Sequence, residues 1–278
     1  MFTIRNFMRP RTLPDLLILG AQRSGTTWLY SILASHPEVA VGQVKEPQAL
    51  TLFWPEAYDV WSRLLPPRRG RHDRRLRIDA SPYMLAHPLA PARAAQIFPK
   101  PPKMIVLLRD PVARAWSHYC HELAAGREFL GFTEALQAEA ERLSGEAERF
   151  DRIVRGLERD RPGMPHQCWS YTERGRYAQQ LDRWRRHFPP AALLILRSED
   201  LFKSPGPTLA TVGAFLGLEG LSLPATELRR NAGPAHSMPD AAQALLRQYL
   251  PDGPAWHDAY NNMTTPLPDG QAGSVHLL

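Results

Sequence analysis

One segment near the start of the chain constrains the fold most, because it joins an apolar run to a glycine-bounded turn and then to an amphipathic stretch. Residues 16–19 are all apolar, the turn lies between Gly20 and Gly25, and the amphipathic stretch follows at once. This order predicts a buried strand, a loop and a helix. Both glycines let the backbone approach an anion closely, and the helix directs unpaired N–H groups and its positive dipole end at the same point. The segment therefore predicts a site for a phosphorylated ligand.

The same loop differs from the loop of nucleoside triphosphatases. Their pattern has two glycines at this spacing, followed by a lysine that contacts the β- and γ-phosphates. This chain has Thr26 at the lysine position, and its cation is Arg23, inside the loop. A nucleoside triphosphate carries about four negative charges and a metal ion, so the missing lysine argues against ATP or GTP chemistry. A ligand with one 5′-phosphate group and little need for a metal fits better, and a glycine turn that binds no ligand is the alternative interpretation.

A second segment is also predicted to be a buried strand, and polar residues follow it directly. Residues 104–108 are apolar and lead into Arg109, Asp110 and Pro111. Pro111 suits the first turn of a helix, which would carry Ser117. Arginine offers a planar fork that matches phosphate oxygens. Arg109 and Ser117 are therefore predicted to bind one anion, and an Arg109 that merely pairs with Asp110 on the surface is the alternative.

Strand-like runs alternate with helical patterns along most of the chain. The runs lie at residues 15–19, 38–41, 76–78, 104–108 and 193–197. Such alternation is typical of a parallel sheet flanked by helices. We therefore expect the α/β class, with a single domain long enough to bury a large core.

Composition divides the chain into segments. Residues 1–13 form a basic leader, residues 14–260 the α/β domain, and residues 261–278 a tail rich in Thr, Pro and Gly that we expect to be flexible. Residues 130–170 have helical composition and mixed charge. We expect them to be a helical insertion that covers the site.

The chain is basic, with a formal net charge of +6. A basic balance suits a doubly phosphorylated ligand and an acidic acceptor, and it also raises the question of nucleic acid. The arginines are dispersed apart from a cluster in residues 68–75, and no zinc-finger, helix-turn-helix or RNA-recognition pattern accompanies them. We therefore expect no nucleic-acid partner.

The cysteine content and the hydropathy of the chain indicate a cellular compartment. The chain has two cysteines, Cys120 and Cys168, which cannot build a disulfide framework and are expected to be reduced. Residues 1–14 lack the apolar core of a signal peptide, and no run approaches the roughly 20 apolar residues that span a bilayer. The sequence thus predicts a cytoplasmic protein of bacterial type without a membrane span.

The two phosphate-binding segments together resemble those of the sulfotransferases that use 3′-phosphoadenosine 5′-phosphosulfate (PAPS). Residues 20–29 look like the family's 5′-phosphosulfate loop, and residues 105–119 look like its 3′-phosphate segment. The most similar branch contains bacterial sulfotransferases and the sulfotransferase domains that modify heparan sulfate. The resemblance runs from about residue 13 to about residue 252. It implies a P-loop-like α/β domain that uses PAPS as the sulfuryl donor and requires no metal ion.

The resemblance also implies a set of donor-binding residues. Those for the 5′-phosphosulfate are Arg23, Ser24, Gly25, Thr26 and Thr27, and Trp28 of the same segment is also expected to bind the donor. Those for the 3′-phosphate are Arg109 and Ser117, and Tyr177 and Arg230 lie in segments that resemble parts of the family near the donor.

Arg23, Lys45 and Glu46 are the predicted catalytic residues. In the family, a glutamate after the second strand serves as the catalytic base, and residues 44–47 resemble that segment. Sulfuryl transfer also needs a cation between the leaving phosphate and the moving group, for which Arg23 and Lys45 are candidates. We expect Lys45 to point toward the donor, because a lysine paired with Glu46 would make it a poorer base. A surface ion pair between these two residues is the alternative interpretation.

This chain departs from the family pattern near the predicted base. Many relatives have a histidine and two aromatic residues where this chain has Gln48, Ala49 and Leu50, and a lysine where it has Ala80. The placement of the acceptor wall therefore does not follow from the resemblance.

Histidines compete with Glu46 for the role of the base. Each of them is also readily explained as a solvated or structural imidazole, and His118 is the first candidate because it lies beside Ser117. The histidines considered are His36, His87, His118 and His121.

These observations predict an enzyme, a PAPS-dependent sulfotransferase that acts by in-line transfer. The acceptor would be a hydroxyl group, and less readily an amine, of a glycan, glycolipid or secondary metabolite. Glu46 would be the general base, a role worth about 10²- to 10⁴-fold in rate. One alternative is a P-loop kinase or NTPase, which would show magnesium-dependent ATP turnover. The other is a non-catalytic nucleotide-binding protein, in which Glu46 would face solvent.

Overall fold

The computed structural model describes residues 12–70, 72–224 and 237–250 of the chain. The predicted tail and Arg230 lie outside these ranges, and so does nearly all of the predicted leader. Within the described ranges, no helix combines the length and the hydropathy that a membrane-spanning segment needs.

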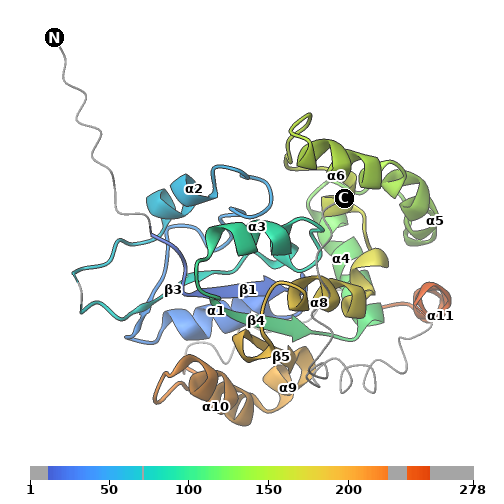
Figure 1. Ribbon diagram of the computed structural model, residues 1–278. Helices are drawn as coiled ribbons and strands as arrows, with labels where there is room; N and C mark the ends of the chain where they lie inside the picture. The colour runs from blue at the N-terminus through green and yellow to red at the C-terminus, as the bar shows by residue number, and fades with distance from the viewer. Residues whose placement is uncertain (1–11, 71, 225–236, 251–278) are drawn as a thin grey trace.

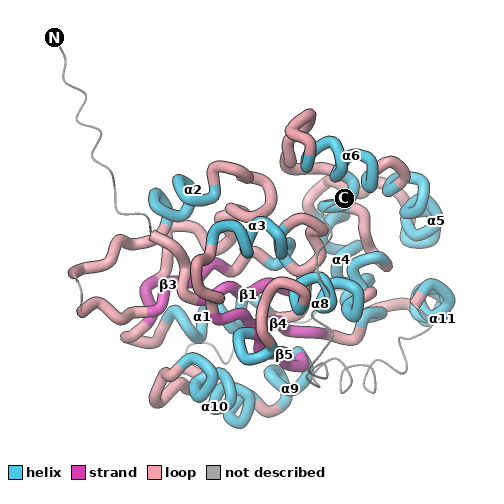
Figure 2. The backbone as a smooth tube through the Cα atoms, in the orientation of Figure 1, coloured by secondary structure: helices cyan, strands magenta, loops and turns pink. Residues whose placement is uncertain are grey.

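The described part of the chain is built on a five-stranded sheet in which every neighbouring pair of strands is parallel (Figures 1 and 2). The strand order is β2-β3-β1-β4-β5. The five predicted runs are confirmed with small shifts at their ends. The strands are β1 (Leu16–Gly20), β2 (Val39–Ala40), β3 (Leu76–Asp79), β4 (Lys103–Leu108) and β5 (Leu193–Arg197).

Helices cover both faces of the sheet, because alternate side chains of each strand point to opposite faces. Leu17 and Leu19 pack into one core and Leu16 and Ile18 into another, and all four are fully buried. The first face is covered by α2 (Ala57–Leu64), α3 (Ala90–Ile97) and α8 (Tyr177–Arg185). The second is covered by α1 (Thr26–Ala34), α9 (Ser198–Lys203) and α10 (Pro205–Leu216). The predicted α/β fold is therefore confirmed as a three-layer domain (Figure 1).

The remaining helices pack beside this domain, near the ends of β4 and β5 (Figure 1). They form a third core between α4, α5 and α11. Residues 130–170 are largely helical, as their composition predicts. The helices are α4 (Pro111–Ala124), α5 (Phe132–Leu143), α6 (Glu146–Val154), α7 (Pro165–Cys168) and α11 (Asp240–Tyr249).

Charged side chains fasten the insertion to the domain. Asp160 pairs with Arg93 of α3 at 2.8 Å and with Arg149 of α6 at 3.5 Å, and Nε2 of His87 lies 3.3 Å away. We call these four residues the Asp160 network. The Asp160 side chain is 2% exposed, so the ion pairs are shielded from water.

The strand order positions the two predicted phosphate segments together. The chain passes from β1 to the edge strand β2, returns to β3 beside β1, and then crosses to β4 on the other side of β1. Loops that leave the carboxyl ends of strands at such a reversal flank a crevice where ligands bind. Residues 21–25 follow β1 and residues 109–111 follow β4, so both border this crevice.

Candidate functional site

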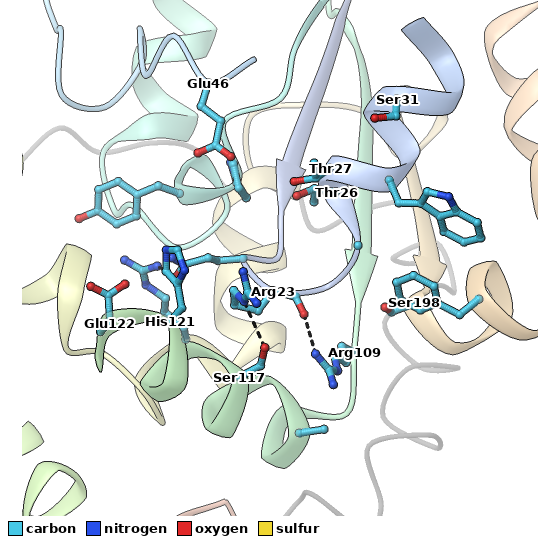
Figure 3. A pocket seen from close by; sticks show the side chains of 18 of the residues that line it. Arg23, Thr26, Thr27, Ser31, Glu46, Arg109, Ser117, His121, Glu122 and Ser198 are labelled. Carbon is cyan, nitrogen blue, oxygen red and sulfur yellow. Dashed lines mark hydrogen bonds between the residues drawn. The ribbon is translucent and has the colours of Figure 1, made fainter. Parts of the chain in front are cut away.

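A cavity of about 1250 Å³ lies at this edge of the sheet. Arg23 stands in its middle in the view of Figure 3, and we divide the other lining residues into two halves. The loop half includes Gly25, Thr26, Thr27, Trp28, Ser31, Arg109, Ser117, Ser198, Glu199, Phe202 and Lys203. The insertion half includes Glu46, Gln48, Tyr83, His121, Glu122, Arg127, Pro162, Gly163, Gln167, Cys168 and Arg174.

The loop half is built on the N-terminus of α1. Gly25 precedes the helix with φ 89°, a left-handed conformation that favours glycine, and no side chain caps the first turn. A side chain at position 25 would also meet Phe202, since a Cβ there would lie 2.9 Å from its ring. The N–H groups of the first turn, with Thr26 and Thr27, are thus available to an anion. This is the arrangement that the sequence predicts.

Two arginines and a serine join the two phosphate segments. Nε of Arg23 donates to Oγ of Ser117 on α4 at 3.1 Å, and Nη1 of Arg109 donates to the carbonyl oxygen of Arg23 at 3.0 Å (Figure 3). Burial, and then the nearby charge of Arg109, lower the pKa of Arg23. Because the two guanidinium groups repel each other, an anion that contacts both is favoured at this place.

The start of α4 explains how Ser117 comes to face the loop. Pro111 occupies the first turn, and the Asp110 side chain accepts a hydrogen bond from the Ala113 N–H at 2.7 Å. These are the usual signals of a helix N-terminus. The predicted helix after Arg109 is confirmed.

An aromatic platform borders the loop half. The rings of Trp28 and Phe202 are stacked, with centroids 5.0 Å apart and planes 7° apart. Phe202 is 41% exposed, so it can offer a face to a planar ligand. Ser198 lies nearby and donates to the Ser24 carbonyl at 2.9 Å.

The insertion half contains the predicted base, but the predicted orientation of Lys45 differs from what is observed. Glu46 lines the cavity and its side chain is 41% exposed. Nζ of Lys45 lies 2.5 Å from Oε1 of Glu46, and Lys45 is not among the residues that line the cavity. The ion pair forms because a flexible ammonium beside a carboxylate gains more from that contact than from pointing toward open space. Arg23 is therefore the predicted catalytic cation that reaches the cavity.

His118, the first candidate among the alternative bases, lies in the interior instead. It is fully buried, and burial lowers its pKa to about 3. Its neighbour His121 lines the cavity, and burial and then Arg23 lower its pKa. Burial would raise the pKa of Glu122, yet contacts with His118 and Arg127 outweigh it and lower that pKa to about 2. Among the four histidines considered, His121 is thus the one that lines the cavity, beside an ionised Glu122.

Arg174 is a buried cation that the sequence did not single out as a site residue. It is 3% exposed, lines the cavity and lies 4.7 Å from the Tyr83 ring centroid. Nη1 donates to the side-chain oxygen of Gln22 in the loop, and Nη2 donates to the carbonyl of Gln167 at 2.7 Å. Its Nε has no hydrogen-bond partner among the described residues, and burial lowers its pKa. A guanidinium held in this way attracts an anionic group in the cavity.

Two other predicted donor-binding residues are observed away from the cavity surface. Ser24 is fully buried under the loop, and it contributes its backbone there. Tyr177 is 3% exposed within the core, and its hydroxyl donates to the Arg109 carbonyl at 2.9 Å. Tyr177 therefore holds the backbone of Arg109 from the core side. Arg230 lies outside the described residues.

The residues present fit a nucleotide that carries two phosphate groups. The loop half offers guanidinium, hydroxyl and backbone N–H donors, which suit phosphate oxygens, and the aromatic platform suits a planar base. Across the described ranges, no three His, Cys, Asp or Glu side chains cluster in a way that could hold a metal ion.

Comparison with known proteins gives the family. A model of the sulfotransferase domain matches residues 13–231. Heparan sulfate glucosamine 3-O-sulfotransferase 3B1 of Homo sapiens is 32% identical over 213 residues, which are 75% of this chain and 47% of that protein. Bifunctional heparan sulfate N-deacetylase/N-sulfotransferase 3 of Homo sapiens is 30% identical over 217 residues, 74% of this chain and 22% of that protein. This chain thus spans about half the length of the 3-O-sulfotransferase and less of the bifunctional protein.

A solved structure shares the fold. The crystal structure of a sulfotransferase from Alicyclobacillus acidocaldarius has a TM-score of 0.65 and 23% identity, and the match covers 89% of this chain and 95% of that one. The domain match over residues 13–231 shows that the chain belongs to the sulfotransferase family.

Several site residues were not predicted from the sequence, although the position of a predicted strand could have indicated some of them. Ser198, Glu199 and Phe202 directly follow β5, so their place at the carboxyl edge could be inferred from the predicted strand. Arg127 and Arg174 lie on either side of the insertion and reach the cavity through tertiary packing, which no local pattern predicts.

Proposed function

We propose that this chain transfers a sulfuryl group from PAPS to a hydroxyl group of a carbohydrate acceptor, with Glu46 as the general base. One observation carries the proposal: the phosphate loop, the Arg23–Ser117 contact and Glu46 all border one cavity. Membership of the sulfotransferase family supports PAPS as the donor. The names of the heparan sulfate relatives support a glycan acceptor, and a glycolipid or a hydroxyl-bearing secondary metabolite is the nearest variant.

The residues of the loop half would hold the donor. The N–H groups at the start of α1, with Thr26 and Thr27, suit its 5′-phosphate, and Arg109 and Ser117 suit its 3′-phosphate. Bound PAPS supplies a sulfuryl group joined to a phosphate that can leave. Arg23 stands between the two halves in Figure 3, where its charge would stabilise the oxygens of the group in transit.

Glu46 would act on the acceptor from the opposite half. Its carboxylate takes the proton of the attacking hydroxyl while the acceptor oxygen forms a bond to sulfur and the bond from sulfur to the phosphate oxygen breaks. The products are a sulfate ester, adenosine 3′,5′-bisphosphate (PAP) and a protonated Glu46. Positioning and charge stabilisation supply most of the rate in such transfers, which agrees with a cavity lined by fixed cations.

Release of PAP from PAPS tests the proposal. The purified chain is incubated with PAPS and either heparan sulfate or p-nitrophenol, and PAP is quantified by chromatography. We expect PAP release that depends on the acceptor and is faster with heparan sulfate. Magnesium-dependent hydrolysis of ATP without PAP release from PAPS would contradict the proposal.

A further inference from the structure

Glu46 is held on both carboxylate oxygens by neighbours in its own loop. Nζ of Lys45 lies 2.5 Å from Oε1, and Nε2 of Gln48 donates to Oε2 at 3.3 Å. The lysine is a flexible point charge at the end of a long stem, so it adds charge but little direction. The direction of the carboxylate therefore depends on Gln48.

The amide of Gln48 has a fixed orientation. A carboxylate can only accept hydrogen bonds, so the NH₂ group of the amide faces Glu46. The hydroxyl of Thr51 donates to the other end, Oε1 of Gln48, at 2.8 Å. Thr51 is fully buried, and Arg93 donates to its carbonyl oxygen at 3.0 Å. The same hydroxyl also lies 3.2 Å from the backbone carbonyl oxygen of Gln48, and a hydroxyl can donate or accept. Glu46 therefore selects the orientation in which the amide is a donor, and Thr51 holds the other end of the amide in place.

The backbone at Gln48 is also held by the interior. Its φ of 54° is left-handed, which is uncommon for a residue with a side chain. Its N–H donates to Oγ of Ser81 at 3.0 Å, and Ser81 donates to Oδ1 of Asp79 at 2.6 Å. Trp61 donates to the other oxygen of Asp79 at 2.7 Å. This chain of bonds maintains an unfavourable conformation that directs the Gln48 side chain at Glu46.

We infer that Gln48 is the positioning residue of the base and that Thr51 anchors its amide. The inference rests on the proposed function, in which Glu46 accepts the proton of the acceptor. An imidazole, which many relatives have at this position, can take up and release a proton, whereas an amide forms hydrogen bonds without exchanging its proton in this way. The proton therefore stays on Glu46 after transfer. Because the Glu46 side chain is 41% exposed, water can remove it from there directly.

Four variants of the full chain test the inference. Gln48→Met keeps the length of the side chain and removes both polar ends, and Thr51→Val removes the hydroxyl while keeping the shape. Thr51→Ser keeps the hydroxyl and serves as the conservative rescue. Gln43→Met is the matched control, because Gln43 is an exposed glutamine of the same segment that does not line the cavity.

Turnover of PAPS with heparan sulfate is measured with PAP affinity as the second readout. We expect Gln48→Met to lower kcat by about 10- to 100-fold, as misplacement of a catalytic group does, and Thr51→Val to lower it less. Thr51→Ser and Gln43→Met should remain near the wild type. The dissociation constant for PAP should be unchanged in all four, because none of these residues belongs to the loop half.

A double-mutant cycle separates positioning from a merely structural role. In a Glu46→Gln background, addition of Gln48→Met should change kcat by less than about twofold, because the group that it positions is already lost. The side-chain NH₂ signals of Gln48 in an NMR spectrum give a readout independent of activity. The chemical shifts of these signals should change in Thr51→Val and should match the wild type in Gln43→Met.

Two results overturn the inference alone: an equal loss of kcat for Gln48→Met with and without Glu46, or an unchanged Gln48 amide signal in Thr51→Val. A wild-type chain that binds PAP but never releases it from PAPS overturns the proposed function, and the inference falls with it.

Discussion

The loop half of the cavity rests on apolar strands, whereas the insertion half is assembled from charged side chains that pair with one another. Thr26 and Arg109 follow β1 and β4, whose residues Leu16 and Leu108 are fully buried. Across the cavity, Arg127 pairs with Glu122 at 2.6 Å, and the insertion behind it is held by the Asp160 network. A core of apolar side chains tolerates small changes in packing. Removal of one partner of a buried ion pair is strongly destabilising, because the other charge stays buried without compensation. The two halves should therefore respond differently to mutation.

The largest expected effect is a loss of catalytic rate when the proposed base is changed. Glu46→Gln keeps the shape of the side chain and removes the base, so kcat for PAPS with heparan sulfate should fall by about 10²- to 10⁴-fold. PAP affinity, a property of the loop half, should not change. Glu38→Gln, at an exposed site before β2, is the matched control. Unchanged turnover in Glu46→Gln would make His121 the first candidate for the base.

A large effect on stability is expected in the Asp160 network. Asp160→Asn leaves Arg93 buried without its carboxylate, so the free energy of unfolding should fall by about 3–5 kcal/mol. Asp151→Asn is the control, since its pair with Arg155 is exposed and worth about 1 kcal/mol or less. Urea unfolding followed by circular dichroism measures both. Equal losses in the two variants would show that the insertion is not held by buried charge.

A comparable but somewhat smaller effect is expected on donor binding. Arg109→Ala should weaken PAP affinity by about 2–4 kcal/mol, because it leaves a phosphate without its charged partner. Arg186→Ala, at an exposed arginine at the end of α8, should bind PAP like the wild type. Calorimetric titration of each variant provides the affinities. Wild-type affinity in Arg109→Ala would remove this residue from the site.

The smallest effect is a pH dependence in the insertion half. The pKa of Glu122 is about 2 in the folded chain, below its ordinary value of 4.5, so ionised Glu122 stabilises the fold above pH 4.5. That contribution is lost as the pH falls from 4.5 toward 2. Glu122→Gln should lower Tm near neutral pH by an amount worth about 1 kcal/mol or less, because Arg127 is partly exposed. The difference in Tm should vanish in acid, and a difference that is the same at every pH would contradict this account.

The same contrast explains what the sequence could predict. The strands, the loop between Gly20 and Gly25 and the helix after Pro111 follow from local patterns, because apolar runs, glycines and helix caps act within a few residues. Glu46 could be predicted to reach the site because it follows β2 at the carboxyl edge of the sheet. The strands, the loop and the helix belong to the sheet and the loop half, and Glu46 is the residue of the insertion half that could be predicted in this way.

The insertion half could not be predicted in this way. The contact between Arg174 and Gln22 joins residues 152 positions apart, and no local pattern encodes it. His118 and His121 are separated by less than one helical turn, so their spacing does not decide which of them lies in the interior. That depends on how α4 packs. Lys45 has a long stem and a neighbouring carboxylate, and its direction is decided by competition between contacts.

Calorimetric titration of the purified chain tests most directly whether the loop half binds a nucleotide with two separate phosphate groups. Adenosine 3′,5′-bisphosphate and magnesium ATP are titrated in parallel. We expect tight binding of one bisphosphate per chain and no heat of binding with ATP. Binding of magnesium ATP without binding of the bisphosphate would contradict this expectation.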